Sequence, residues 1–281
     1  MSDTLRRCRP LLGTFVEVAS DCEQAVDAAF EAAEAVHRLM SAHDPDSELS
    51  RINRMAHLGP VPVSSWTAAV IERAGYWARL SGGLFDIVRA GSSALRRGAL
   101  PLHPNQPVPD PMADWTAVTI ADGFVTLDRP ACLDLGGIAK GFAVDRAVEA
   151  MIVAGATCGL VNAGGDLRGF GADPWPVTIV DPLTRQPLVM VDLEDSALAT
   201  SAGLPMPDGR LDHRHVPGAS PRWISVTVRA DNACDADALT KILWSGDGAA
   251  QTLLDQAGAQ AIAIGADRRV EPFDARQAVA A

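Results

Sequence analysis

The stretch LDLGGIAKGFAVD places a lysine where a helix disfavours one. Lys140 falls in the first turn of a predicted helix, where unpaired N–H groups and the helix dipole already carry positive charge. No carboxylate stands three or four residues away, so its partner is either Asp134, folded back across the turn, or a bound anion. Gly136 and Gly137 would let a phosphate approach the backbone, which favours an anion site. A solvated lysine on a glycine-rich turn is the alternative.

A second group of candidate residues lies in ADALTK, near the C-terminus. Asp237 and Thr240 are three residues apart on one helical face, and they could present a carboxylate and a hydroxyl oxygen to a hard cation such as Mg²⁺. A structural explanation competes with this one. Asp237 would lie in a first turn, and with Lys241 it makes an acid-first i, i+4 pair worth about 0.2–0.5 kcal/mol without any function.

Other polar residues give weaker signals. His213 and His215 lie in the loop-like stretch LDHRHVPG and could act as a general base, although a surface position is the commoner explanation. In NAGGD, a tight turn with Asp166 capping its own backbone is a sufficient explanation. Thr200 and Ser201 in TSAG are expected in a loop. GxSxG, P-loop and HExxH motifs are absent, which excludes the familiar hydrolase, NTPase and metalloprotease patterns.

The elements that must position these residues form an α+β pattern, because strands and helices are interspersed without strict alternation. Strands are predicted at 15–20, 158–164, 176–180, 188–193, 223–228 and 261–265, with a hairpin at Asp122-Gly123. Helices are predicted at 22–40, 63–80, 138–154, 235–244 and 248–256. Val144, Val148 and Ile152, with Met151 beside them, form an apolar stripe. Five prolines make 98–115 an irregular surface excursion.

Composition limits the classes of partner. The chain has 281 residues and a formal net charge of -11, which would repel a nucleic-acid backbone or an anionic membrane surface. The five cysteines are scattered and odd in number, which argues against a disulfide framework or a structural zinc site. Neither a signal peptide nor an apolar run long enough to span a membrane is visible, so we expect a cytoplasmic protein without membrane insertion.

The order of the motifs resembles one known family. RPLLGT, SAHDPDSELSRIN, GLFD, LDLGGIAKGFAVD, NAGGD, ALATSAG and ADALTK follow one another between Arg9 and about Trp244. In this order they resemble the ApbE-like family of FAD:protein FMN transferases. The resemblance implies a single domain over residues 1–281, with an α+β, T-fold-related, two-lobed architecture and the flavin site between the lobes. It also implies a Mg²⁺-dependent reaction that cleaves FAD, releases AMP and joins FMN to a Thr or Ser hydroxyl of an acceptor flavoprotein.

The resemblance also implies site residues. The positions expected to contact FAD are Leu12, His43, Leu84, Phe85, Asp86, Asp134, Lys140 and Thr200. Those expected at the metal are Asp237, Thr240 and the backbone of Gly137. His213 is the preferred base because it keeps a four-residue spacing to Pro217, with His215 in reserve.

Three departures from the family pattern are visible. Lys241 stands where the family usually has a metal-binding threonine, and its ammonium could pair with Asp237 and displace the metal, or contact the pyrophosphate. DHRHVPG replaces the family's His-Ile-Ile-Asp-Pro segment, and His43 stands where an aromatic residue is common. Two alternatives therefore stay open: an FAD pyrophosphatase, which would use water as the nucleophile, and a non-catalytic FAD-binding protein.

Overall fold

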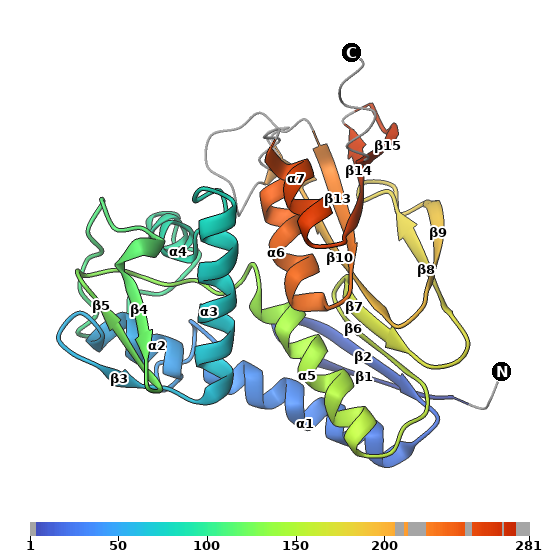
Figure 1. Cartoon of the computed structure of the whole chain (residues 1–281), viewed down its shortest axis with the longest axis horizontal. Helices are drawn as coiled ribbons and strands as arrows, with labels where there is room; N and C mark the ends of the chain where they lie inside the picture. The colour runs from blue at the N-terminus through green and yellow to red at the C-terminus, as the bar shows by residue number, and fades with distance from the viewer. Residues whose placement is uncertain (1–3, 206–210, 213–222, 245–248, 266, 274–281) are drawn as a thin grey trace. The chain divides into compact units, whose positions relative to one another are not determined.

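The chain divides into two compact units, which we describe separately. The computed structural model describes residues 4–205, 211–212, 223–244, 249–265 and 267–273. The first unit combines the chain up to Glu34 with the chain from Lys140 onward, and the second is Ala35–Ala139 (Figure 1). Helix α1 (Glu23–Met40) continues from one into the other. Within the described residues, no helix combines the length and the apolar character that crossing a membrane requires.

An eight-stranded antiparallel sheet forms the centre of the first unit, in the order β1-β2-β6-β7-β10-β13-β14-β15. The strands are β1 (Leu5–Leu11), β2 (Thr14–Ser20), β6 (Gly159–Ala163), β7 (Asp166–Phe170), β10 (Ser196–Ala202), β13 (Trp223–Ala230), β14 (Gln260–Gly265) and β15 (Val270–Phe273). A separate hairpin pairs β8 (Trp175–Val180) with β9 (Pro187–Leu193), and a short one pairs β11 (Leu204–Pro205) with β12 (Leu211–Asp212). The helices are α5 (Ala139–Val153), α6 (Ala233–Trp244) and α7 (Ala249–Gln256).

The two faces of this sheet are covered differently. Side chains alternate along a strand, so neighbouring residues of β10 enter different cores. Ala197 joins a core cluster with α1 and α5, whereas Leu198 packs with Leu193 of the β8–β9 hairpin. Figure 1 shows the same division, with α5 and α6 on one side and the hairpin on the other. Strand alternation therefore decides which polar residues of β10 face the helices.

The second unit is built around a small sheet and three helices. Its antiparallel strands, in the order β3-β5-β4, are β3 (Val61–Pro62), β4 (Val118–Ala121) and β5 (Phe124–Leu127). The helices are α2 (Glu48–Met55), α3 (Ser65–Leu80) and α4 (Ile87–Arg96), with a 3₁₀ turn η1 (Trp115–Ala117). The β4–β5 turn uses Asp122 at φ 51° and Gly123 at φ 78°, the positive values that a two-residue hairpin requires.

The α+β class is confirmed, and so are the predicted helices, strands and hairpin. No helix or strand occurs between α4 and η1, as the prolines predict. The sequence analysis missed the helices α2, α4 and η1 and the strands β1, β3, β7, β10, β11, β12 and β15. Thr200, Ser201 and Ala202 of TSAG lie in strand β10 rather than in a loop. The apolar stripe of α5 is partly wrong: Val144, Val148 and Met151 are buried, but Ile152 is 50% exposed.

Candidate functional site

Helices α5 and α6 meet at Gly141. A Cβ atom on Gly141 would lie 2.1 Å from the carbonyl oxygen of Ala233, so no larger residue fits there. One turn further along α5, the carboxylate of Asp145 accepts hydrogen bonds of 2.9 Å from the backbone N–H groups of both Ala233 and Cys234. It thereby caps the start of α6 from a different helix. These contacts hold the first turn of α5 against α6.

The partner of Lys140 is a residue that the sequence analysis assigned to a turn. The Lys140 ammonium pairs with Asp166 at the start of β7, and it lies 3.9 Å from Oδ2 of Asp237 on α6. Asp166 and Asp237 are 1% and 0% exposed, whereas Lys140 is 31% exposed. The sequence predicted Asp134 or a bound anion as the partner. Among the described residues, the carboxylate that pairs with the ammonium is Asp166 rather than Asp134, and the bound anion stays a prediction.

The NAGGD turn is therefore built differently from the prediction. Asn162 stabilises the turn, because its side-chain oxygen accepts from the backbone N–H of Gly165 at 3.0 Å. Asp166 does not cap its own backbone: its Oδ2 holds Lys140, and its buried Oδ1 has no hydrogen-bond partner within the described part of the chain. The Asp166 carboxylate therefore pairs with Lys140 and does not cap the turn.

Lys241 lies on the other side of Asp237. Its ammonium contacts three oxygen atoms: Oδ1 of Asp237 at 2.8 Å, Oγ of Ser201 at 2.5 Å and Oγ1 of Thr240 at 3.0 Å. The expected Asp237–Lys241 pair is confirmed, but the lysine is only 11% exposed. Helix α6 starts at Ala233, so Asp237 lies beyond the first turn rather than in it. We call Lys140, Asp166, Ser201, Asp237, Thr240 and Lys241 the lysine cluster.

Both lysines of the chain belong to this cluster. The sequence contains 24 Lys and Arg residues, and Lys140 and Lys241 are the two lysines among them. An arginine guanidinium is flat and rigid, whereas an ammonium is compact and directs three donors. The chain therefore uses lysine where a small cation has to fit between carboxylates.

The charges within the cluster shift one another's pKa values. Burial by itself would lower the pKa of Lys140, but the carboxylates of Asp166 and Asp237 outweigh it, so its pKa is raised. Burial would raise the pKa of Asp237, but the ammonium groups of Lys140 and Lys241 outweigh burial and lower it. Burial, followed by repulsion from Asp237, raises the pKa of Asp166 to about 6. Asp237 therefore stays ionised to a lower pH than Asp166.

The donor atoms do not fit the Mg²⁺ site that the resemblance implies. A metal ion at Asp237 and Thr240 would need the two oxygens that already surround the Lys241 ammonium, and it would meet that positive charge at contact distance. Gly137, the third expected contributor, lies two residues before α5. No group of three or more His, Cys, Asp or Glu side chains within the described residues could hold a metal ion.

Thr200 faces away from the lysine cluster. Neighbouring residues of a strand point to opposite faces, so Ser201 contacts Thr240 of α6 at 2.7 Å while Thr200 contacts Thr227 of β13 at 3.0 Å. Thr200 and Thr227 line a pocket of about 500 Å³ on the other face, together with residues of the β8–β9 hairpin. The sequence analysis named both hydroxyls but expected them together in a loop. Only the assignment of this segment to a strand shows that they point to opposite faces of the sheet.

In the second unit, two of the residues expected to contact FAD influence each other. Burial raises the pKa of Asp134, and the positive charges of Arg97 and His43 oppose that rise. Oδ1 of Asp134 accepts from the backbone N–H of Gly136 at 2.8 Å, and His43 is exposed. Asp134, His43 and Arg97 therefore form a second polar group, which sequence reasoning named without the arginine.

Asp86 has a structural task in the same unit. Its Oδ1 accepts from the backbone N–H groups of Val88 at 2.8 Å and Arg89 at 3.0 Å, so it caps helix α4. Its Oδ2 accepts from the N–H of Trp115 at 3.3 Å, which ties η1 to that helix end. The two residues before it differ, since Phe85 is buried and Leu84 is 37% exposed.

Leu12 and the histidines complete the expected set. Leu12 occupies the β1–β2 turn at φ 57°, a left-handed conformation that costs a non-glycine residue free energy, and it packs against the core cluster of the first unit. His213 and His215 lie outside the described residues.

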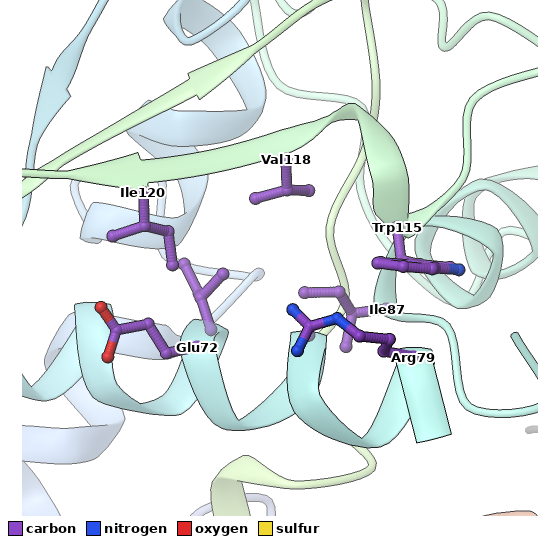
Figure 2. A pocket seen from close by; sticks show the side chains of 8 residues that line it. Glu72, Arg79, Ile87, Trp115, Val118 and Ile120 are labelled. Carbon is purple, nitrogen blue, oxygen red and sulfur yellow. The ribbon is translucent and has the colours of Figure 1, made fainter. Parts of the chain in front are cut away.

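A separate pocket of about 270 Å³ lies in the second unit, between α3 and β4. Figure 2 shows Glu72 and Arg79 on α3, with Val118 and Ile120 of β4 opposite them and Trp115 at one end. The residues that line it include none of the positions that the motifs mark. We therefore do not assign it to the candidate site.

Sequence reasoning missed Asp145 and Asp166 as site residues and took Ser201 as a loop hydroxyl. Asp145 is the last residue of LDLGGIAKGFAVD. Because it lies far from any predicted helix start along the chain, its role as a cap of α6 could not be predicted. Asp166 had a signal, because an unpaired lysine and a turn aspartate at a strand end are natural partners. Recognising TSAG as a strand would have placed Ser201 on the helix-covered face.

Comparison with known proteins identifies the family. The model of the ApbE family matches residues 12–263. An FAD:protein FMN transferase of Treponema pallidum (strain Nichols) is 27% identical, over 94% of this chain and 85% of that protein. The fold matches a flavin transferase ApbE from Vibrio cholerae, with a TM-score of 0.83, 23% identity and 97% of each chain covered. It also matches the ApbE protein of Thermotoga maritima, with a TM-score of 0.85, 24% identity and 98% and 99% of the two chains covered. The chain belongs to the ApbE family.

Proposed function

We propose that this protein is an FAD:protein FMN transferase that works as one domain across both units. The observation that carries the proposal is the lysine cluster, where both lysines of the chain meet two buried carboxylates at the start of α5. Lys140 is the more exposed of the two, and it lies in the first helical turn, where the helix dipole also favours an anion. A diphosphate such as that of FAD suits this combination.

The reaction exchanges one phosphoester partner for another. A hydroxyl oxygen of the acceptor protein attacks the phosphorus of the FMN half, and the P–O bond to the bridging oxygen breaks. AMP leaves with that oxygen, and the hydroxyl proton passes to a base. Lys140 stabilises the negative charge that develops on the phosphoryl oxygens, and the dipole of α5 acts in the same direction. His213 and His215 remain the predicted bases.

The remaining residues support this assignment to different degrees. Asp134, His43, Leu84, Phe85 and Leu12 stay predicted flavin contacts, whereas the contacts of Asp86 already explain its presence as a helix cap. Thr200 was also predicted to contact FAD, but it lies on the opposite face of the sheet from the lysine cluster, so we leave it out of the proposed site. Mg²⁺ and a cytoplasmic location also stay predictions, and the surroundings of Lys241 argue against a metal at Asp237.

The acceptor is proposed to be a flavoprotein that presents a threonine or serine hydroxyl. The test incubates the full chain with FAD and a threonine-bearing acceptor domain, and follows AMP by chromatography and the acceptor by intact mass. We expect AMP and an acceptor that is heavier by one FMN, in equal amounts. FMN and AMP without acceptor modification would instead identify a pyrophosphatase. Bound FAD without AMP would identify a binding protein.

A further inference from the structure

The ammonium of Lys241 is surrounded as a bound metal ion would be. Three oxygens from β10 and α6 approach it within 3.0 Å, and these contacts use all three of its N–H donors. Thr240 is itself held by its own hydrogen bond of 2.7 Å to the backbone oxygen of Asp237. The Lys241 ammonium therefore occupies the position that these three oxygens surround.

This lysine is not an ordinary solvated partner of an i, i+4 pair. Such pairs lie at the surface and contribute little, whereas Asp237 is fully buried and Lys241 is 11% exposed. Burying an ammonium is costly unless its donors and its charge are both satisfied. Here Asp237 satisfies the charge and two hydroxyls satisfy the remaining donors.

The charge balance of the cluster depends on Lys241. With Lys140 and Lys241 protonated and Asp166 and Asp237 ionised, two positive charges face two negative charges. Without Lys241 the group carries one excess negative charge, which would attract a cation and repel a diphosphate. A threonine at position 241 would leave that charge and would add a fourth oxygen to the three from Ser201, Asp237 and Thr240.

We propose that the Lys241 ammonium takes the place of a metal ion in this site, so that the protein binds FAD without a divalent cation. The inference rests on the proposed function for the identity of the ligand. Lys241 is a positioning residue, because its donors are spent on protein oxygens and it acts on the diphosphate through charge alone. The site of the natural chain is therefore closed to metal.

The test compares FAD binding and metal binding by the full chain and by Lys241→Thr. FAD affinity is measured from flavin fluorescence with EDTA or with Mg²⁺, and metal retention from the EPR signal of free Mn²⁺. We expect the natural chain to bind FAD equally well in both buffers and to leave Mn²⁺ free. Lys241→Thr should bind FAD at least about tenfold more weakly in EDTA, because the diphosphate then meets one excess negative charge, and Mg²⁺ should restore binding by offsetting that charge.

A second variant separates metal replacement from a simple packing role. Lys241→Met keeps the length of the side chain but supplies neither charge nor oxygen, so it should lose FAD affinity without rescue by Mg²⁺. Circular dichroism establishes that both variants are folded. Equal rescue of the two variants, no rescue of the threonine variant, or a natural chain that needs Mg²⁺ to bind FAD would each overturn the inference. If the natural chain binds no FAD in either buffer, the proposed function fails instead.

Discussion

Two buried aspartates of the motif set, Asp86 and Asp237, show how different partners give the same residue type different tasks. Backbone N–H groups surround Asp86, and burial still raises its pKa. Ammonium groups surround Asp237, and they outweigh burial and lower its pKa. The first carboxylate is fully used by the fold, whereas the second holds the cations that a diphosphate needs. Burial alone therefore does not identify a functional carboxylate.

The strongest test of this comparison is removal of Lys140. We expect Lys140→Met to slow AMP release about 10²- to 10³-fold, because one preorganised charge at the reacting phosphoryl group is lost. The free energy of unfolding should fall by about 3 kcal/mol, since Asp166 then stays buried without its cation. Urea unfolding and AMP release measure the two effects. Adding Asp166→Asn should restore stability but not activity, and recovery of both would show that Lys140 is only structural.

Removal of the Asp86 carboxylate tests the aspartate to which we assign a structural role. Asp86→Ala should lower the free energy of unfolding by about 2 kcal/mol, because helix α4 loses its cap and Trp115 loses an acceptor. Asp86→Asn keeps an acceptor oxygen and should cost less. The affinity of Asp86→Asn for FAD should match that of the natural chain. A large loss of FAD affinity in a stable Asp86→Asn variant would contradict this expectation and would support Asp86 as an FAD contact.

Two neighbouring hydroxyls on β10 sharpen the placement of the ligand. Ser201→Ala removes an oxygen from the Lys241 ammonium and should weaken FAD binding about tenfold, whereas Thr200→Val changes the opposite face of the sheet and should have little effect. Fluorescence titration of the two variants gives the comparison directly. A larger effect at Thr200 would place FAD in the pocket under the β8–β9 hairpin.

A further expected effect is a pH dependence of stability from Asp166. Its pKa is raised to about 6 in the folded protein, so the folded state holds a proton that the unfolded chain has already released. This stabilising contribution is complete below the unfolded pKa near 3.8 and is lost as the pH rises through about 6. Urea unfolding should show stability falling across that window. Asp166→Asn should flatten the slope, and Asp128→Asn, at an exposed site, should not.

Local patterns were sufficient for most of the fold. The helix α5, the β4–β5 hairpin and the irregular segment before η1 follow from spacing, from Asp-Gly and from proline, because those effects act within a few residues. Strand β10 was not predicted, because ALATSA lacks the large β-branched residues that are typical of strands. Strand β1 was not predicted either, because its arginines and mostly exposed side chains do not alternate between apolar and polar residues.

By itself, the sequence determined that a lysine stands at a helix start, that an aspartate and a lysine share one face of α6, and that the motifs follow the order of the ApbE family. Only the tertiary structure decided that Asp166 neutralises Lys140 and that Ser201, rather than Thr200, reaches Lys241. The reason is that these partners lie on different strands and helices, and their pairing depends on sheet register and on the close contact at Gly141. Charge neutralisation acts through space, and separation along the chain does not reveal it.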